Sequence, residues 1–263
     1  MTTEQPTRSV DLSVVVPGTP AEVWDAIATG AGITSWFVPV ELDERVGGAV
    51  VSDFGSFGKE EATVTAYDPP HRFAALLGTQ PGDGRVIATE WLIEARDGAT
   101  CTVRLVHSGF RAGDDWDAEY CGMVEGWKLF FENLRLHLTF FKGEHAQAIV
   151  PMRTIPGPNA RAWTQLCGAI GVASDLNAGD VLETDAAAPL PLHGSVHHAQ
   201  RTAKVSNYLA VLEGPLRGTA VIAAEGDGDA VMVSTWLYLY GGDTAPIERS
   251  VNELLARLAE PVS

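Results

Sequence analysis

The sequence has few cysteines and no long apolar run, and each shortage excludes a kind of protein. The three cysteines, Cys101, Cys121 and Cys167, are scattered and form no CxxC pair, so we expect reduced thiols in a cytoplasmic protein. No run of about eighteen apolar residues occurs, which excludes a membrane-spanning helix. The first residues are polar, so we also expect no secretory signal.

Basic residues are scarce, because 18 Lys and Arg stand against 34 Asp and Glu, for a net charge of −16. A field of that sign repels phosphate backbones, and no basic stripe is interleaved with aromatic residues. We therefore expect no nucleic-acid partner and interpret the acidity as favouring solubility. The hydrophobic share of 46% and the length of 263 residues indicate a globular protein of one large domain or two smaller ones.

The most informative stretch is residues 117–141, DAEYCGMVEGWKLFFENLRLHLTFF, which predicts a long helix. Its apolar residues recur at spacings of three and four, so they share one face of that helix. These residues are Met123, Trp127, Phe130, Phe131, Leu134, Leu138 and Phe141. A stripe this broad needs a large concave partner, and a curved sheet that grips the helix would leave a cavity between the two.

The chain before this helix predicts the sheet. Residues 9–16 are strand-like, and a short helix follows that Thr19, Pro20 and Glu22 begin as a capping box. A second short helical turn comes at residues 33–37. Six strand-like segments separated by turn residues then follow, at 38–43, 49–54, 62–67, 72–77, 85–95 and 100–110. The predicted order is strand, two short helices, six strands and a long helix.

Five motifs in this order resemble a known superfamily. They are TPAEVWDAIATGAGITSWF, GGAV, ATVTAYDPPHRFAALL, TEWLIEARDGATCTVRLVHSGF and GWKLFFENLRLHL. Together, over residues 9–142, they resemble the START/SRPBCC superfamily, in the branch homologous to the C-terminal domain of activators of the Hsp90 heat-shock-protein ATPase. The resemblance implies an α+β helix-grip fold, with a curved antiparallel sheet around a long C-terminal helix. It does not specify one function, since the superfamily includes lipid carriers, hormone receptors and polyketide cyclases.

The second part of the chain repeats these features in shorter form. PNARAWTQLCGAIGV echoes TPAEVWDAIATGAGI, with Trp163 in the place of Trp24, and NYLAVLEG echoes RFAALLG. PIERSVNELLARL predicts a shorter final helix. Repetition of this kind favours a duplication over chance similarity of strand-turn-strand patterns. We predict an activator-type helix-grip domain at residues 1–146 and a smaller, diverged helix-grip-like domain at residues 147–263.

The predicted cavity would take its wall from the sheet and the long helix. Its expected ligand-binding residues are Trp36, Phe54, Trp91, His107, Trp127, Phe130, Phe131 and Leu134, with Phe37 as a further wall candidate. Ordinary core packing is the alternative for the aromatic residues. His107 could orient a ligand or shuttle a proton, and a hydrogen-bonded strand residue is the alternative there.

A second cluster of polar residues lies at His193, His197 and His198, shortly after Glu183 and Asp185. Imidazoles four residues apart on a helix could bind zinc. The neighbouring residues Pro189, Pro191 and Gly194 oppose a helix, so we expect an exposed loop leading into a strand and no metal site. No other spacing predicts a catalytic group or a cofactor.

These observations favour a non-enzymatic carrier or sensor that binds a small hydrophobic or amphipathic molecule. The first alternative is a co-chaperone-like module with a protein partner, as the family resemblance implies. The activators carry a further domain before the helix-grip module, however, and here the first strand begins near Ser9, which argues against chaperone activation. The second alternative is a cyclase- or hydrolase-type enzyme that uses His107 and the nearby carboxylates of Asp114, Asp115, Asp117 and Glu119 in the same cavity.

Overall fold

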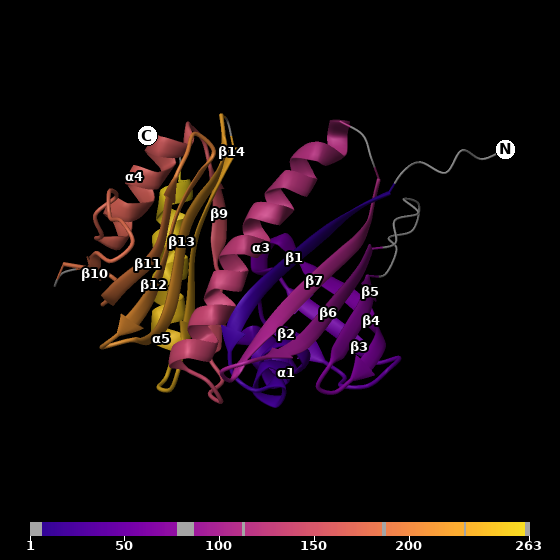
Figure 1. The fold of residues 1–263 in the computed structure, drawn as a ribbon. Helices are drawn as coiled ribbons and strands as arrows, with labels where there is room; N and C mark the ends of the chain where they lie inside the picture. Colours follow the sequence, from indigo (N-terminus) through magenta and orange to yellow (C-terminus); the bar gives the residue numbers. More distant parts are fainter. Residues whose placement is uncertain (1–6, 78–86, 112–113, 186–187, 229, 261–263) are drawn as a thin grey trace. The chain divides into compact units, whose positions relative to one another are not determined.

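The computed structural model describes residues 7–77, 87–111, 114–185, 188–228 and 230–260. It divides into two compact units (Figure 1). Unit 1 comprises residues 1–54 and 59–145, and unit 2 comprises residues 55–58 and 146–263. No helix in the described part of the chain is long and apolar enough to cross a membrane.

Unit 1 is a seven-stranded antiparallel sheet with three helices. Its elements are β1 (Thr7–Pro17), α1 (Pro20–Ala28), α2 (Gly30–Thr34), β2 (Val40–Leu42), β3 (Ala49–Asp53), β4 (Lys59–Asp68), β5 (Arg72–Leu77), β6 (Ile87–Arg96), β7 (Thr100–Arg111) and α3 (Asp114–Phe140). The strand order is β1-β7-β6-β5-β4-β3-β2. The order of elements confirms the predicted helix-grip architecture.

Local signals set the beginning of α1 as predicted. The Glu22 backbone N–H donates to Thr19 Oγ1 at 3.4 Å, and the Thr19 backbone N–H donates to Glu22 Oε2 at 2.7 Å. Pro20 occupies the first turn. This capping box satisfies two N–H groups that a helix end would otherwise leave without partners.

The core of unit 1 lies between one face of the sheet and the helices. Strand alternation directs Trp91 and Ile93 of β6 and Val103 and Leu105 of β7 to this face, where they form one cluster with apolar residues of α1 and α3. From α3 the cluster takes Phe131, Leu134 and Leu138, which share one side of the helix. The long helix therefore packs along the sheet through the stripe that its sequence predicts.

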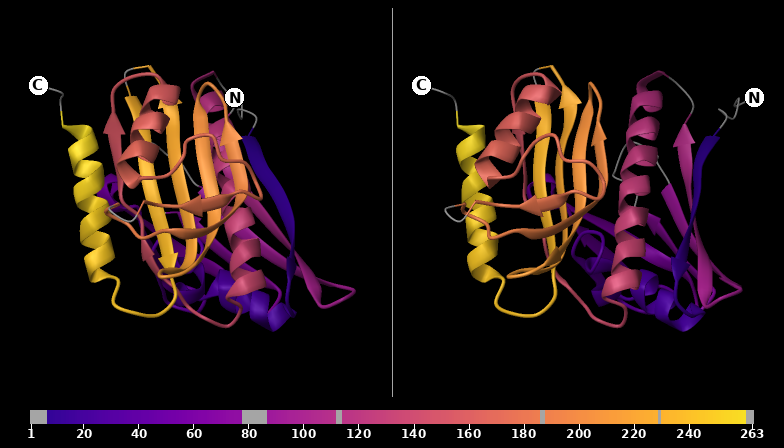
Figure 2. Two further views of the ribbon diagram at one scale, coloured as in Figure 1. Left: turned by 90° about the vertical axis from the view of Figure 1, so that its left-hand side faces the viewer. Right: turned by 60° about the vertical axis from the view of Figure 1, so that its left-hand side comes forward.

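Unit 2 repeats this plan with a seven-stranded sheet of its own. They are the short helix η1 (Gly55–Phe57), β8 (Gln147–Ile149), β9 (Met152–Ile155), α4 (Asn159–Ile170), β10 (Val181–Glu183), β11 (His193–Arg201), β12 (Val205–Glu213), β13 (Arg217–Asp227), β14 (Ala230–Leu239) and α5 (Ala245–Ala259). The strand order is β10-β11-β12-β13-β14-β8, with β9 also paired to β14. Figure 2 shows α4 and α5 on the same face of this sheet.

The strand order of unit 2, read from β8 and β9 to β10, corresponds to that of unit 1 from β1 to β3, and the edge strand β2 has no counterpart. In unit 1 the N-terminal strand pairs with the last strand, β7, and in unit 2 the N-terminal strands β8 and β9 pair with the last strand, β14. The final helix is shorter, because α5 has 15 residues and α3 has 27. Unit 2 is thus the second, smaller helix-grip-like domain that the sequence predicts.

Each unit also contains an edge-to-face pair of a tryptophan and a tyrosine. The ring centroids of Trp24 and Tyr67 are 5.0 Å apart, and those of Trp163 and Tyr208 are 4.6 Å apart. In both pairs the tryptophan comes from the first α-helix of the unit, α1 or α4. Each tyrosine hydroxyl donates to a backbone carbonyl at or just after that helix, at Ala28 in unit 1 and Ala173 in unit 2.

Candidate ligand-binding site

The segment after α2 is the first part of the candidate site in unit 1, and hydrogen bonds fix its position. Thr29 Oγ1 accepts from the Gly32 N–H at 3.0 Å, and the indole Nε1 of Trp36 donates to the Ala26 carbonyl at 2.8 Å. A Cβ on Gly32 would lie 1.9 Å from the Asp25 carbonyl oxygen, so only glycine permits this approach of α2 to α1. Trp36 is therefore held in place and is 1% exposed.

Phe37 lies at the centre of an aromatic cluster. Its ring stacks on Trp127 of α3, with centroids 5.1 Å apart and planes at 20°. It meets Phe130 of α3 edge to face at 4.8 Å, and Phe54 at 5.9 Å. Such geometries are the favourable ones for aromatic pairs. The cluster thus joins the segment after α2, the end of β3 and the long helix.

Trp91 of β6 extends this cluster onto the sheet. Its ring lies 5.8 Å from that of Trp36, 5.5 Å from that of Trp127 and 6.0 Å from that of Phe131. The six aromatic residues predicted to bind a ligand therefore lie close together, and Phe37, the further wall candidate, lies among them. Hereafter the aromatic cluster means these seven residues: Trp36, Phe37, Phe54, Trp91, Trp127, Phe130 and Phe131.

Burial separates the predicted wall residues into two groups. Trp36, Trp91, Phe131 and Leu134 are buried, and Leu134 is wholly inaccessible to solvent. The rings that remain partly exposed are those of Phe37, Phe54, Trp127 and Phe130. The first group belongs to the core of the unit. The second group has apolar surface that a ligand could still cover.

His107 lies on the core-facing side of β7, since it follows Val103 and Leu105 at spacings of two. Its Nδ1 is 3.0 Å from Thr89 Oγ1 on the neighbouring strand β6. Burial lowers the pKa of His107 to about 4. The imidazole is therefore neutral at pH 7, which suits a hydrogen-bonding role better than that of a fixed cation.

Asn133 of α3 is a polar residue that reading the sequence did not single out. Its side-chain amide is buried and donates to the Trp36 backbone carbonyl at 2.9 Å. It thereby ties the long helix to the segment that carries Trp36 and Phe37. Only its position on the apolar side of the helix could have pointed to this role. The side chains of Asp114, Asp115, Asp117 and Glu119 lie outside the described part of the structure.

The second part of the chain has the predicted strand after a loop, but the strand begins at His193, so the three histidines lie in it and not in the loop. His193, His197 and His198 belong to β11, because pairing with β10 and β12 fixes this segment despite its flanking prolines. His193 Nδ1 is 3.8 Å from Glu183 Oε1. Among the described residues, no group of three or more His, Cys, Asp or Glu side chains could hold a metal ion.

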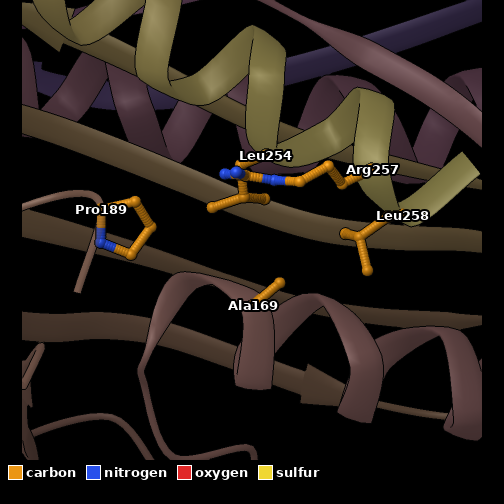
Figure 3. A pocket seen from close by; sticks show the side chains of 5 residues that line it. All are labelled: Ala169, Pro189, Leu254, Arg257 and Leu258. Atoms are coloured by element: carbon orange, nitrogen blue, oxygen red, sulfur yellow. The ribbon is translucent and has the colours of Figure 1, made fainter. Parts of the chain in front are cut away.

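Unit 2 has a cleft of about 380 Å³ that reading the sequence did not predict (Figure 3). It is lined by Ala169, Pro189, Leu254, Arg257 and Leu258. These residues come from α4, from the segment between β10 and β11, and from α5. No local pattern could have indicated it, because its walls are distant in the sequence.

Comparison with known proteins finds a family model that matches most of the first unit. Residues 17–139 match the family model described as Activator of Hsp90 ATPase homolog 1-like protein. No curated protein matches the sequence.

Three solved structures are among those to which this chain is similar. The Aha1 dimer from Colwellia psychrerythraea is 20% identical, with a TM-score of 0.45 over 52% of this chain and 99% of that one. Protein MLL2253 from Mesorhizobium loti is 22% identical, with a TM-score of 0.46 over 51% and 99%. The di-domain ARO/CYC BexL from the BE-7585A biosynthetic pathway is 14% identical, with a TM-score of 0.45 over 97% and 100%.

Proposed function

We propose that the first unit binds a small, mainly apolar molecule against the aromatic cluster. Its helix-grip fold and its match to the family model of activator of Hsp90 ATPase homolog 1-like proteins support this proposal. The observation that carries the proposal is the contact of Phe37, Trp127 and Phe130 with one another while all three rings remain partly exposed. Covering apolar surface stabilises a complex by about 25 cal/mol per Å².

The polar pair formed by His107 and Thr89 supports a ligand with one hydrogen-bonding group. Thr89 precedes Trp91 by two residues on β6, so it lies on the same face of the sheet, about 7 Å from Trp91 along the strand. A neutral imidazole and a hydroxyl can donate or accept without adding a charge to an apolar site. The proposed ligand is therefore an apolar molecule with one hydroxyl or carbonyl group.

Native mass spectrometry of the protein purified from its own host tests this proposal. We expect a reproducible extra mass that is reduced or lost in Phe130→Ala. The matched control is Phe140→Ala, which removes a 47% exposed ring from the same helix outside the aromatic cluster and leaves the extra mass unchanged.

Calorimetric titration with 2-naphthol, an aromatic probe with one hydroxyl, provides a second measurement. Truncation of a ring at the centre of a binding site commonly costs more than about 1 kcal/mol, so Phe130→Ala should weaken binding at least about fivefold. Absence of both an extra mass and saturable 2-naphthol binding would overturn the proposal. So would equal binding by Phe130→Ala and the wild type, provided that circular dichroism shows both to be folded.

The family description favours one further candidate function, stimulation of an Hsp90-type ATPase. It rests on the family match and not on a site in the structure. Measurement of ATP hydrolysis by Hsp90 with and without this protein decides it, and an unchanged rate would exclude it.

A further inference from the structure

The cleft in unit 2 is a second candidate site, and none of its residues belongs to the aromatic cluster. Leu254 of α5 is 2% exposed and forms its floor, while Ala169 of α4 and Leu258 of α5 are partly buried and form its sides. Figure 3 shows the side chains of α5 facing Ala169, with Pro189 at one end. A volume of about 380 Å³ lies within the range of small-molecule sites, about 300–1,000 Å³.

Hydrogen bonds hold the segment that carries Pro189 in place. Thr184 Oγ1 donates to the Leu190 carbonyl at 2.7 Å and accepts from the Leu192 N–H at 2.9 Å. The side chains of Leu190 and Leu192 are both buried in the core of unit 2. Pro189 itself is exposed at the cleft. This wall is therefore formed before any ligand arrives, which reduces the entropic cost of binding.

Arg257 provides the polar group of the cleft. Its guanidinium makes no hydrogen bond or ion pair with any described residue, and its side chain runs along α5 toward Leu254 (Figure 3). The stem of an arginine can cover apolar surface while its charged end remains available to an anion. The chain has a net charge of −16, so most of its charged surface repels anions. An arginine beside an apolar floor, without a partner among the described residues, is therefore a place where an anion could bind.

We propose that this cleft binds a small amphipathic anion, with an acyl or similar apolar chain over Leu254, Ala169 and Leu258 and a carboxylate on Arg257. A planar guanidinium matches a carboxylate through two parallel hydrogen bonds. The apolar residues would recognise the chain, and Arg257 would distinguish an acid from the corresponding alcohol. This site is independent of the aromatic cluster in unit 1, so either proposal can fail without the other.

Methyl-resolved NMR of the full chain, titrated with decanoate and separately with decan-1-ol, tests the proposal. We expect decanoate to shift the methyl signals of Ala169, Leu254 and Leu258, and decan-1-ol to shift them with lower affinity. Arg257→Gln should weaken decanoate binding roughly tenfold and leave decan-1-ol binding unchanged. The matched control is Arg249→Gln, an exposed arginine of α5 outside the cleft, which should bind decanoate as the wild type does.

A second variant, Ala169→Leu, fills the cleft and should weaken both probes. Ala169 is partly exposed, so the larger side chain can be accommodated, and circular dichroism would verify the fold. Equal decanoate affinity in Arg257→Gln and Arg249→Gln would overturn the proposal, as expected if Arg257 only stabilises the C-terminal end of its helix. Decanoate shifts confined to residues outside the cleft would overturn it as well.

Discussion

The side-chain amide of Asn133 donates a hydrogen bond to the backbone carbonyl oxygen of Trp36, across 2.9 Å in the buried interior of unit 1. Loss of this donor leaves the Trp36 carbonyl buried without that partner, and an unsatisfied buried group costs about 1–3 kcal/mol. We predict that Asn133→Ala lowers the free energy of unfolding by this amount in urea titrations. Thr139→Ala, at an exposed position of the same helix, should change it by less than about 0.5 kcal/mol. Similar losses in both variants would contradict this role for Asn133.

His137 of α3 is expected to make unit 1 less stable as the pH falls. Burial and, to a smaller extent, the neighbouring His145 lower its pKa to about 4, against the opposite effects of Asp25 and Glu144. The unfolded chain, with an ordinary histidine pKa of about 6.5, binds this proton more readily. Stability is therefore fully present above about pH 6.5 and is lost progressively toward pH 4, by up to about 3 kcal/mol.

The measurement is the free energy of unfolding of the wild type and His137→Gln between pH 7.5 and 4.5. We expect the difference between the two to narrow as the pH falls, because the wild type alone loses the His137 contribution. Taking the difference removes the effects of the other titrating groups, among them Glu225, whose pKa burial raises. A difference that stays constant across this range would show that His137 does not titrate as expected.

Asn159, the first residue of α4, is predicted to stabilise unit 2. Its buried side-chain amide donates to the Ala224 carbonyl at 2.8 Å and to the Gly226 carbonyl at 3.2 Å, and its Oδ1 accepts from Ser206 Oγ at 2.7 Å. Asn159→Ala should cost about 2–3 kcal/mol, and Ser206→Ala, which removes one bond, should cost less. Thermal unfolding followed by circular dichroism provides the comparison. A larger loss in Ser206→Ala would show that the hydroxyl, not the amide, is the main contributor.

Two glycines of unit 2 should respond in opposite ways to replacement by alanine. A Cβ on Gly168 of α4 meets no atom within 4 Å, whereas a Cβ on Gly194 of β11 would lie 1.9 Å from the Val211 carbonyl oxygen. We predict that Gly168→Ala raises stability by about 0.5–1 kcal/mol, since glycine is unfavourable within a helix. Gly194→Ala should lower the melting temperature and the yield of folded protein. Destabilisation by Gly168→Ala would mean that α4 bends or moves in a way that the structure does not show.

The sequence was informative wherever alternation or helical periodicity was strong. The strand predicted at residues 72–77 forms as β5 with the same bounds, and its apolar residues Phe73, Ala74 and Ala75 are buried. The helix predicted from residue 117 begins at Asp114. Its first residues are acidic and lack the apolar spacing, although acidic residues are favourable at a helix N-terminus.

The features that reading the sequence missed depend on contacts between distant segments. Proline and glycine near His193 argued correctly against a helix, but the residue at which the strand begins depends on pairing with β10 and β12. The cleft needs Ala169, Pro189 and Leu254 on three elements to meet around one space. The spacing of the aromatic residues along the sequence was sufficient to predict that they lie together. The hydrogen bond from Asn133 could not be predicted in this way, because its acceptor is a backbone atom.

The two hydrophobic cores, one around Trp163 and the other around Trp36, share no residue. Selection can therefore act on each core separately, because a substitution that disturbs the packing of one does not remove a contact within the other. The family match ends at residue 139, yet the strand order of unit 1 recurs in unit 2. An alternating pattern can survive extensive drift of individual residues. We infer from the recurring strand order that unit 2 arose by duplication, which would let the second copy lose the aromatic cluster while keeping the scaffold.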